Sequence, residues 1–159
     1  MKEKFMKEAL KEALKAKNKE EVPVGAVIVL NDKIIARAHN LRETKMNSLC
    51  HAEILAINKA CKNLNNFRLE DCELYVTLEP CLMCAGAIVQ SRIKKVIIGA
   101  KDHKYGMAGT EFNAFEIKSN HNVEIEFGIM EEECSNVIKD FFKKLREEHK
   151  KDNKKQLKA

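Results

Sequence analysis

The spacing of hydrophobic residues along the chain predicts four helices and five strands. Over residues 2–17, apolar side chains recur every three or four positions, which is typical of a helix with one buried face. Short apolar runs bounded by turn residues predict strands, and Asn31-Asp32-Lys33 lies between two of them, as expected for a hairpin turn. We expect helices at 2–17, 51–62, 80–90 and 131–150, and strands at 24–30, 34–38, 73–78, 95–99 and 123–127.

The order of these elements predicts an α/β fold. A helix is followed by a hairpin, and helices and strands then alternate. Such alternation places a partly parallel sheet between layers of helices. The 159 residues are enough for one domain with its own core. We assign residues 1–150 to this domain, and we expect the lysine-rich residues 151–159 to form a frayed tail.

Composition and charge narrow the class of protein. With 45% hydrophobic and 33% charged residues, the chain has the composition of a globular protein. No apolar run reaches the roughly 18 residues of a membrane span, and residues 1–8 lack an apolar signal segment, so we expect a cytoplasmic protein. In a reducing cytosol the six cysteines are not expected to form disulfides. The net charge of +5 weakly favours a polyanionic partner.

Two short motifs carry the residues best suited to chemistry. His51-Ala52-Glu53 opens one predicted helix, and Pro80-Cys81-Leu82-Met83-Cys84 opens another. Cys81 and Cys84 are three residues apart, so a helical turn places both sulfurs on one face. Both helices follow a strand, so their N-terminal ends can meet at one end of the sheet, where ligands usually bind. The partial positive charge of helix N-termini favours thiolates there.

One imidazole and two thiolates form a ligand set suited to zinc. Catalytic zinc sites keep one position open for water, whereas structural sites usually close with four protein ligands. Zinc lowers the pKa of such a water toward about 7. Glu53, two residues after His51, is then placed to take a proton from the water and pass it to a departing nitrogen.

The alternative to a catalytic site is a structural one with a fourth protein ligand. Cys50, Cys61 or His39 could supply that ligand, and Cys50 is the strongest candidate because it adjoins His51. A closed site of this kind would leave Glu53 without a task. We interpret Cys61, Cys72 and Cys134, which lie among apolar neighbours, as buried thiols.

The two motifs resemble the signature of the cytidine deaminase superfamily, in which His-x-Glu is followed by Pro-Cys-x-x-Cys. Further blocks resemble, more narrowly, the bacterial tRNA adenosine deaminases, and this resemblance covers about residues 5–147. The blocks are Glu21 to Ala26, Ala38 to Asn40, Leu74 to Cys81, Met83 to Ala87, Ser91 to Ile93, Gly99 to Asp102, the loop of Gly106 and Gly109, and Phe141-Phe142.

The resemblance implies a three-layer α/β/α fold with a five-stranded mixed sheet, one Zn²⁺ per subunit and a homodimer. It implies hydrolytic deamination of adenosine to inosine at the wobble position of a tRNA anticodon, with an arginine tRNA as the expected substrate. His51, Cys81 and Cys84 are the implied zinc ligands, and Glu53 is the implied proton shuttle. The implied substrate contacts are Asn40, Val24, Ala52, Leu78 and Asp102, and the implied RNA contacts are Phe141, Phe142, Lys143 and Arg146.

Several of these residues also have a purely structural interpretation. Asn40 could cap a turn, Val24 and Leu78 could be core residues, and Asp102 could be a plain loop residue. The lysines from Lys143 onward could form a solvated face. Adjacent residues of a helix point in different directions, so Phe141 and Phe142 cannot both face the core, and we expect one of them to be exposed.

The chain also departs from the family pattern. Cys50, behind Leu49, stands where the family usually has a small residue, and Tyr105 and Met107 enlarge a loop that is often smaller. These departures could alter the sequence context accepted around the target base.

Two other functions fit the same metal motif. A free-base or nucleoside deaminase of the guanine or cytosine type would share the site, and activity on small substrates would reveal it. A non-catalytic, zinc-stabilised RNA-binding module would instead hold zinc with four protein ligands.

Overall fold

The computed structural model describes residues 1–158, which form one sheet with helices on both faces. The helices are α1 (Lys2–Asn18), α2 (Ala52–Leu64), α3 (Leu82–Gln90) and α4 (Glu131–Lys158), together with a short 3-10 helix, η1 (Ala114–Glu116). The strands are β1 (Gly25–Leu30), β2 (Lys33–His39), β3 (Glu73–Leu78), β4 (Lys95–Ala100) and β5 (Glu124–Phe127).

The five strands pair in the order β2-β1-β3-β4-β5. β1 runs antiparallel to β2 and β3, whereas β3, β4 and β5 are parallel to one another. Asn31 and Asp32 turn the β1–β2 hairpin with φ angles of 50° and 60°, a left-handed conformation that these two residue types tolerate. Because β3 and β4 end at the same edge, the segments that follow them start side by side.

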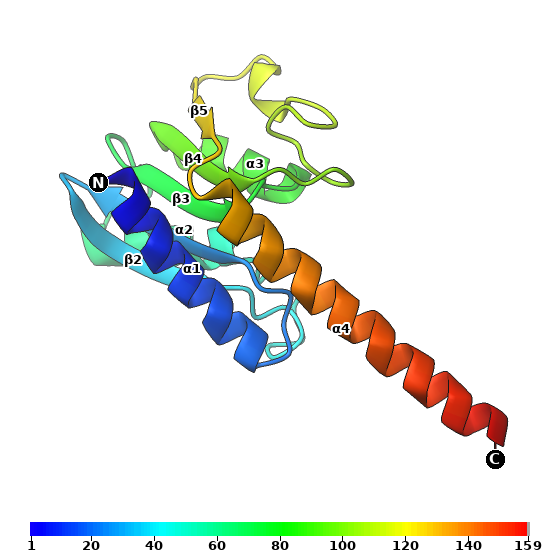
Figure 1. Ribbon diagram of the computed structural model, residues 1–159. Helices are drawn as coiled ribbons and strands as arrows, with labels where there is room; N and C mark the ends of the chain where they lie inside the picture. The colour runs from blue at the N-terminus through cyan, green and yellow to red at the C-terminus, as the bar shows by residue number, and fades with distance from the viewer. Residues whose placement is uncertain (159) are drawn as a thin grey trace.

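The sheet separates two apolar cores, since adjacent residues of a strand point to opposite faces. α2 and α3 cover one face and contribute Ala56 and Ile88 to its core. α1 and α4 cover the other face and contribute Phe5 and Cys134. Figure 1 shows α1 and α4 lying in front of the sheet, with α2 and α3 behind it. The structure is therefore a three-layer α/β/α sandwich, as predicted.

The start of β1 lies very close to α1. A Cβ atom added at Gly25 would lie 1.9 Å from the backbone oxygen of Ala9, well inside van der Waals contact. Glycine is therefore required at this position for space, so that helix and strand can pack backbone against backbone.

The last helix is longer than predicted. The sequence analysis places its end at about Lys150, but α4 continues to Lys158, so that prediction is wrong. Residues 131–158 contain neither glycine nor proline, and the lysine and glutamate residues that dominate the segment favour helix. The distal half of α4 projects away from the body of the molecule (Figure 1).

The other predicted helices and strands agree with the structure to within two residues at each end. The five-stranded mixed sheet is confirmed. η1 is not predicted. None of the helices within residues 1–158 is both long enough and apolar enough to cross a membrane.

Candidate active site

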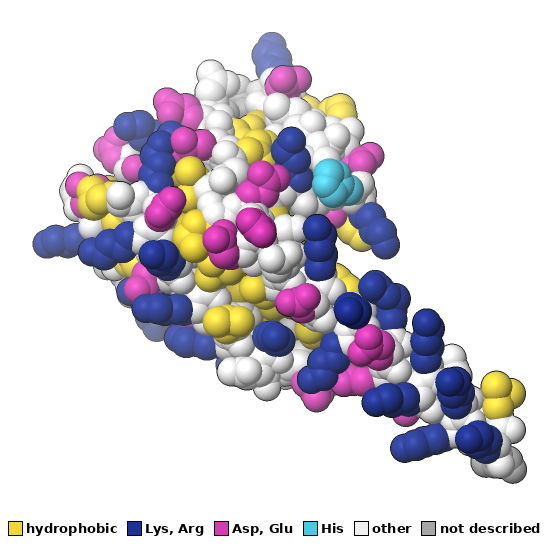
Figure 2. Space-filling view, viewed as in Figure 1, with side chains coloured by type: hydrophobic (Ala, Val, Ile, Leu, Met, Phe, Trp, Pro, Cys, Tyr) yellow, Lys and Arg dark blue, Asp and Glu magenta, His cyan; other side chains and the backbone are white. Residues whose placement is uncertain are grey.

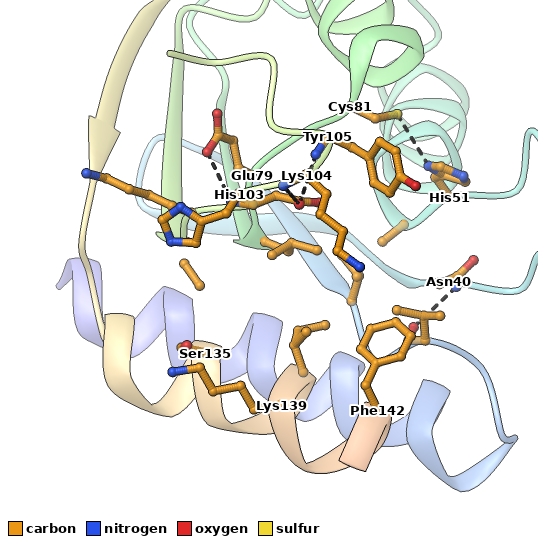
Figure 3. Close-up of a pocket in the computed structure, with 18 of the residues that line it drawn as sticks. Asn40, His51, Glu79, Cys81, His103, Lys104, Tyr105, Ser135, Lys139 and Phe142 are labelled. Atoms are coloured by element: carbon orange, nitrogen blue, oxygen red, sulfur yellow. Dashed lines mark hydrogen bonds between the residues drawn. The ribbon is translucent and has the colours of Figure 1, made fainter. Parts of the chain in front are cut away.

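A cavity of about 910 Å³ lies at the edge of the sheet where β3 and β4 end. The last residues of these strands, Leu78 and Ala100, form part of its wall. His51 and Cys81, which precede α2 and α3, line it from one layer of the sandwich. The loop that follows β4 and the pocket-facing side of α4 complete the wall, and Figure 3 shows Tyr105 and Phe142 on these two sides.

The three predicted metal ligands meet beside this cavity. His51 Nδ1 lies 3.7 Å from Cys81 Sγ and 3.6 Å from Cys84 Sγ, and the ligand atoms of the three residues all lie within 4.8 Å of one another. His51 and Cys81 are the N-cap residues of α2 and α3, and Cys84 lies in the first turn of α3. The predicted meeting of two helix N-termini is confirmed.

The geometry of this cluster fits a zinc ion. With Zn–S distances of about 2.3 Å and Zn–N distances of about 2.0 Å, a tetrahedral site has N···S edges of about 3.6 Å. The two N···S distances in the structure, 3.7 and 3.6 Å, match that edge. An imidazole nitrogen and two sulfurs are also ligands that zinc prefers. The residues therefore fit a zinc ion both in chemistry and in their N···S spacing.

The protonation states of the cluster favour the binding of a cation. Hydrogen bonds from Cys84 and His51 lower the pKa of Cys81 to about 4, although burial opposes the shift. The hydrogen bond to Cys81 in turn raises the pKa of His51. The hydrogen bond to Cys81 and burial together raise the pKa of Cys84. At neutral pH the cluster therefore already contains one thiolate, the form of cysteine that binds metals.

Glu53 is a buried carboxyl group that lines the same cavity. It is the second residue of α2 and is 4% exposed. Burial raises its pKa to about 7, while a hydrogen bond with its own backbone amide acts in the opposite direction. A group with a pKa near neutrality can both accept and release a proton at physiological pH, as a proton shuttle must.

The described residues do not complete a four-ligand site. Among residues 1–158, the cluster of His51, Cys81 and Cys84 is the one group of three or more His, Cys, Asp or Glu side chains with metal-ligand spacing, so Cys50 and Cys61 lie outside it. His39, the third alternative, pairs through Nδ1 with Glu12 Oε1 at 3.1 Å.

The remaining cysteines behave as buried thiols. Cys72 and Cys134 are at most 1% exposed, and burial raises the pKa of Cys72 to about 11 and that of Cys134 to about 12. Cys61 is partly buried, and burial raises its pKa as well. These thiols are therefore protonated at neutral pH, and the thiolate form that binds metals is disfavoured.

Asn40 stabilises a turn and also lines the cavity, so both interpretations of this residue, as a turn cap and as a substrate contact, fit the structure. Its Nδ2 donates to Val22 O at 3.2 Å, and its Oδ1 accepts from Arg42 N at 3.1 Å, so it does stabilise a turn. It also lines the cavity and is 8% exposed. A primary amide has two N–H groups and two acceptor lone pairs, so Asn40 can make both turn contacts and still bond a ligand.

Val24, Ala52 and Leu78 also line the cavity. Ala52 is fully buried, whereas Val24 and Leu78 are half-buried. They therefore give the cavity an apolar surface close to His51 and Glu53, which is suited to the face of a planar ring.

Asp102, the last of the expected substrate contacts, lines the cavity. The four expected RNA contacts divide into two groups. Phe142 and Arg146 line the cavity, and Phe142 is 38% exposed. Of the described residues, Phe141 and Lys143 are not part of the lining, and the ring of Phe141 packs edge-on against Phe142 at 5.3 Å. The prediction that one of the two phenylalanines is exposed is confirmed for Phe142.

Sequence reasoning missed several residues of the cavity. Basic side chains surround its mouth: Arg42, Lys101, His103, Lys104 and Lys139. These residues lie far apart in the sequence, on two loops and on α4, so the sequence does not indicate that they are neighbours. Glu79 was also missed, although its position beside Pro80 and Cys81 was a usable signal.

A three-layer sandwich that brings a His/Cys/Cys cluster and a buried glutamate to one cavity defines the class of metal-dependent nucleobase deaminases. Comparison with known proteins supports this class and narrows it. The profile of the MafB19-like deaminase family matches residues 1–146. The tRNA-specific adenosine deaminase of Bacillus subtilis (strain 168) is 56% identical over 147 residues, which cover 92% of this chain and 91% of that protein.

Two solved structures are similar to the chain. One, from a study of A-to-I editing by tRNA:A34 deaminases at the wobble position of transfer RNA, has a TM-score of 0.78 and 39% identity and covers 84% of this chain and 98% of its own. A guanine deaminase from Bacillus subtilis has a TM-score of 0.60 and 44% identity but covers 62% of this chain and 64% of its own. The chain belongs to the family of the tRNA-specific adenosine deaminases.

Proposed function

We propose that the protein converts adenosine to inosine at the wobble position of a tRNA anticodon by zinc-dependent hydrolysis. The observation that carries this proposal is a single cavity that combines a His/Cys/Cys cluster and Glu53 with a basic rim. The relatives that match the chain over nine-tenths of its length act, by name, on tRNA adenosine.

The residues of the site divide the chemistry between them. His51, Cys81 and Cys84 would hold the zinc, which when bound would supply a water acidic enough to act as the nucleophile. Glu53 accepts a proton from the attacking water and delivers it to the ring nitrogen beside C6 of adenine. Glu53 then takes the second proton, from the hydroxyl group added at C6, and delivers it to the amino group. The C6–N bond breaks, and the products are inosine and ammonia.

The base is held by the apolar and amide groups around Glu53. Val24, Ala52 and Leu78 contact its ring, and the remaining capacity of the Asn40 amide bonds one of its edges. Asp102 lies farther out, on the loop, and contacts a neighbouring nucleotide. Flipping a nucleotide out of a loop costs less than flipping it out of a duplex, which suits an anticodon loop.

One side of α4 extends the basic rim along the RNA. Lys139, Lys143, Arg146, Lys150 and Lys154 are exposed and spaced by three or four residues, so they share one side of the helix. We call this set the α4 stripe; it spans about 22 Å at 1.5 Å per residue. Lys139 and Arg146 reach the cavity itself. Figure 2 shows dark blue Lys and Arg side chains crowded along the projecting, distal half of α4.

The α4 stripe is suited to the phosphates that flank the target nucleotide. Phe142, at the cavity end of the same helix, is exposed enough to stack on a base of the loop. Phe141 packs against Phe142 and supports its orientation.

We extend the proposal to a cytoplasmic homodimer that acts on an arginine tRNA. Support for the dimer comes from large apolar side chains that are exposed close in sequence to the metal ligands: Leu49, two residues before His51, is 56% exposed, and Leu82, directly after Cys81, is 61% exposed. Met46, in the loop that leads to His51, is 93% exposed. Burial of such side chains against a second subunit would be favourable. Light scattering of the purified protein should give twice the mass of the chain, and a monomeric mass at micromolar concentration would contradict the dimer.

The proposed activity can be tested with the zinc-loaded protein and an anticodon stem-loop of an arginine tRNA that carries adenosine at the wobble position. We expect inosine to form at that position and free adenosine, guanine and cytidine to remain unchanged. Turnover of a free base or nucleoside would favour the small-substrate deaminase instead. Tight binding without any deamination would favour an RNA-binding module.

A further inference from the structure

Glu79 is a buried carboxyl group to which the proposed chemistry gives no task. It lies between the end of β3 and Pro80-Cys81, and it is 3% exposed. It is not part of the metal cluster, and no salt bridge within residues 1–158 involves it. A buried carboxylate without a cationic partner must be stabilised by other hydrogen-bond donors.

Those donors all come from one segment, the loop of residues 101–112, which we call the lid loop. Glu79 Oε1 accepts from Asp102 N at 3.2 Å and from the hydroxyl of Thr110. Glu79 Oε2 accepts from Ala108 N at 3.0 Å and from Thr110 N at 3.2 Å. Both oxygens are thus occupied by the same loop, at points eight residues apart.

The lid loop is shaped around this carboxylate. A Cβ atom added at Gly106 would lie 2.6 Å from Glu79 Oε1 and 2.5 Å from Asp102 O, so a side chain at this position has no room. The adjacent residue, Met107, donates its backbone N–H to Pro80 O at 3.0 Å. The loop therefore closes on the segment that carries the metal ligand Cys81.

The lid loop also forms a wall of the cavity, through Lys101, Asp102, His103, Lys104 and Tyr105. Asp102 is held directly, since its backbone N–H donates to Glu79, and its side chain then accepts from the backbone of Lys104 and Tyr105. Figure 3 shows Glu79 behind this wall, on the side away from Phe142.

We propose that Glu79 is a positioning residue that sets the substrate-binding wall of the lid loop at a fixed distance from the metal cluster. The proposal rests on the proposed function, because the wall is inferred to contact nucleotides next to the target base. Glu79 lies two residues before Cys81, so a single short segment fixes both the reacting centre and the wall that orients the RNA.

The side-chain chemistry predicts what a change at Glu79 would do. Glutamine has nearly the same volume but only one acceptor oxygen, and its NH₂ group would face two of the four donors. Glu79→Gln should therefore release part of the lid loop without changing the metal ligands. Thr110→Val removes the side-chain donor alone and should act in the same direction more weakly.

The experiment compares Glu79→Gln and Thr110→Val with Glu111→Gln, which makes the same charge change at an exposed position of the lid loop. Amide hydrogen exchange, zinc content, and kcat and KM for the stem-loop are measured for each protein. In Glu79→Gln we expect the amides that face the new NH₂ group, either that of Asp102 or those of Ala108 and Thr110, to exchange about tenfold faster. A factor of this size corresponds to the loss of a hydrogen bond to a charged acceptor. We expect KM to rise by a similar factor, with kcat less affected and zinc unchanged.

Faster exchange with an unchanged KM would show that Glu79 has a structural role alone, and unchanged exchange would overturn the proposal outright. If Glu79→Gln does not fold, Thr110→Val decides between the same outcomes. If the wild-type protein does not deaminate the stem-loop, the proposed function fails, whereas hydrogen exchange and stem-loop affinity still test the link between Glu79 and the lid loop.

Discussion

At the scale of single residues, the site depends on the different environments of two acidic side chains. Glu53 is buried beside the metal cluster, and its pKa is raised to about 7. Glu79 is equally buried but is bonded to donors of the lid loop. Two glutamates near one cavity thus have separate tasks, because one faces the reacting centre and the other faces the protein.

Replacing Glu53 by alanine should remove turnover and leave the metal in place. A carboxylate that transfers protons contributes about 10²- to 10⁴-fold to the rate, and Glu53 is not part of the ligand cluster. Zinc content and deamination rate measured on the same sample test both expectations. His51→Ala is the control, since it should lose both metal and activity; loss of zinc from Glu53→Ala would contradict the assigned role.

A third buried glutamate, Glu21, should give the fold a specific pH dependence. Burial acts to raise its pKa, but hydrogen bonds from the backbone amides of Thr44 and Glu43 outweigh burial, so the pKa lies below its ordinary value. A carboxylate with a lowered pKa stabilises the folded state above its unfolded pKa of about 4.3, and this stability is lost as the pH falls through the folded pKa.

Glu21→Gln should therefore destabilise the protein by about 1–3 kcal/mol at pH 7, because its amide NH₂ would face a backbone N–H. The difference from wild type should shrink in urea unfolding as the pH falls below about 4. Glu20→Gln, at an exposed neighbour, serves as the control. A difference that persists unchanged into acid would contradict the assignment.

At the scale of elements, α4 combines packing at one end with charge at the other. Cys134 packs in the core, Phe142 reaches the cavity, and the residues beyond Arg146 project away from the body of the protein. The family profile ends at residue 146, so the distal part of the helix is a feature of this chain beyond the matched region.

The α4 stripe should contribute to RNA binding through its charge. Replacing Lys143, Lys150 and Lys154 by alanine should weaken stem-loop binding and reduce the salt slope of log K by about 2, since each single-strand phosphate contact contributes about 0.7. The control replaces Lys144, Lys151 and Lys155 by alanine, which removes the same charge from positions about 100° around the helix axis from the α4 stripe. Equal effects of the two triple variants would contradict a directional contact.

The sequence predicts the regular elements well and the segments between them poorly. Strands such as residues 73–78 are predicted correctly because their apolar runs are short and bounded by turn residues. The end of α4 was missed because solvent-exposed lysines carry no burial signal. The shape of the lid loop could not be predicted, because it depends on hydrogen bonds to Glu79, which is about 30 residues away in sequence. η1 could not be predicted either, because it is a single turn capped by the side chain of Asn113 and has no hydrophobic periodicity.

In the candidate site, too, residues with a local sequence signal could be predicted, and residues brought together by the tertiary fold could not. His51, Cys81 and Cys84 are recognisable because their chemistry and spacing are unusual. Lys101, Lys139 and Arg42 become neighbours through the tertiary fold, and their residue types are common on any surface.

At the scale of the whole molecule, the metal cluster joins two helices that otherwise share a modest contact. His51 caps α2, and Cys81 and Cys84 begin α3. A ligand that binds the folded state alone stabilises it by about 2.7 kcal/mol at a concentration 100 times its Kd.

Removal of zinc by a chelator should therefore lower the melting temperature, by about 5–10 °C for a chain of this size. Calorimetry before and after chelation measures the shift. Added Zn²⁺ should reverse it and Mg²⁺ should not, because imidazole and thiolate are poor ligands for magnesium. An unchanged melting temperature after complete chelation would contradict a metal that bridges the two helices.

The division of the molecule into two cores affects which substitutions the protein can accept without loss of activity. The metal ligands lie on the helices of one face of the sheet, and the basic helix lies on the other. Substitutions that retune which RNA is accepted can therefore accumulate in α4 without disturbing the reacting centre. The part of RNA recognition that lies on the distal half of α4 is therefore open to selection or engineering without change to catalysis, whereas the part that lies on the lid loop is tied to the metal ligands through Glu79.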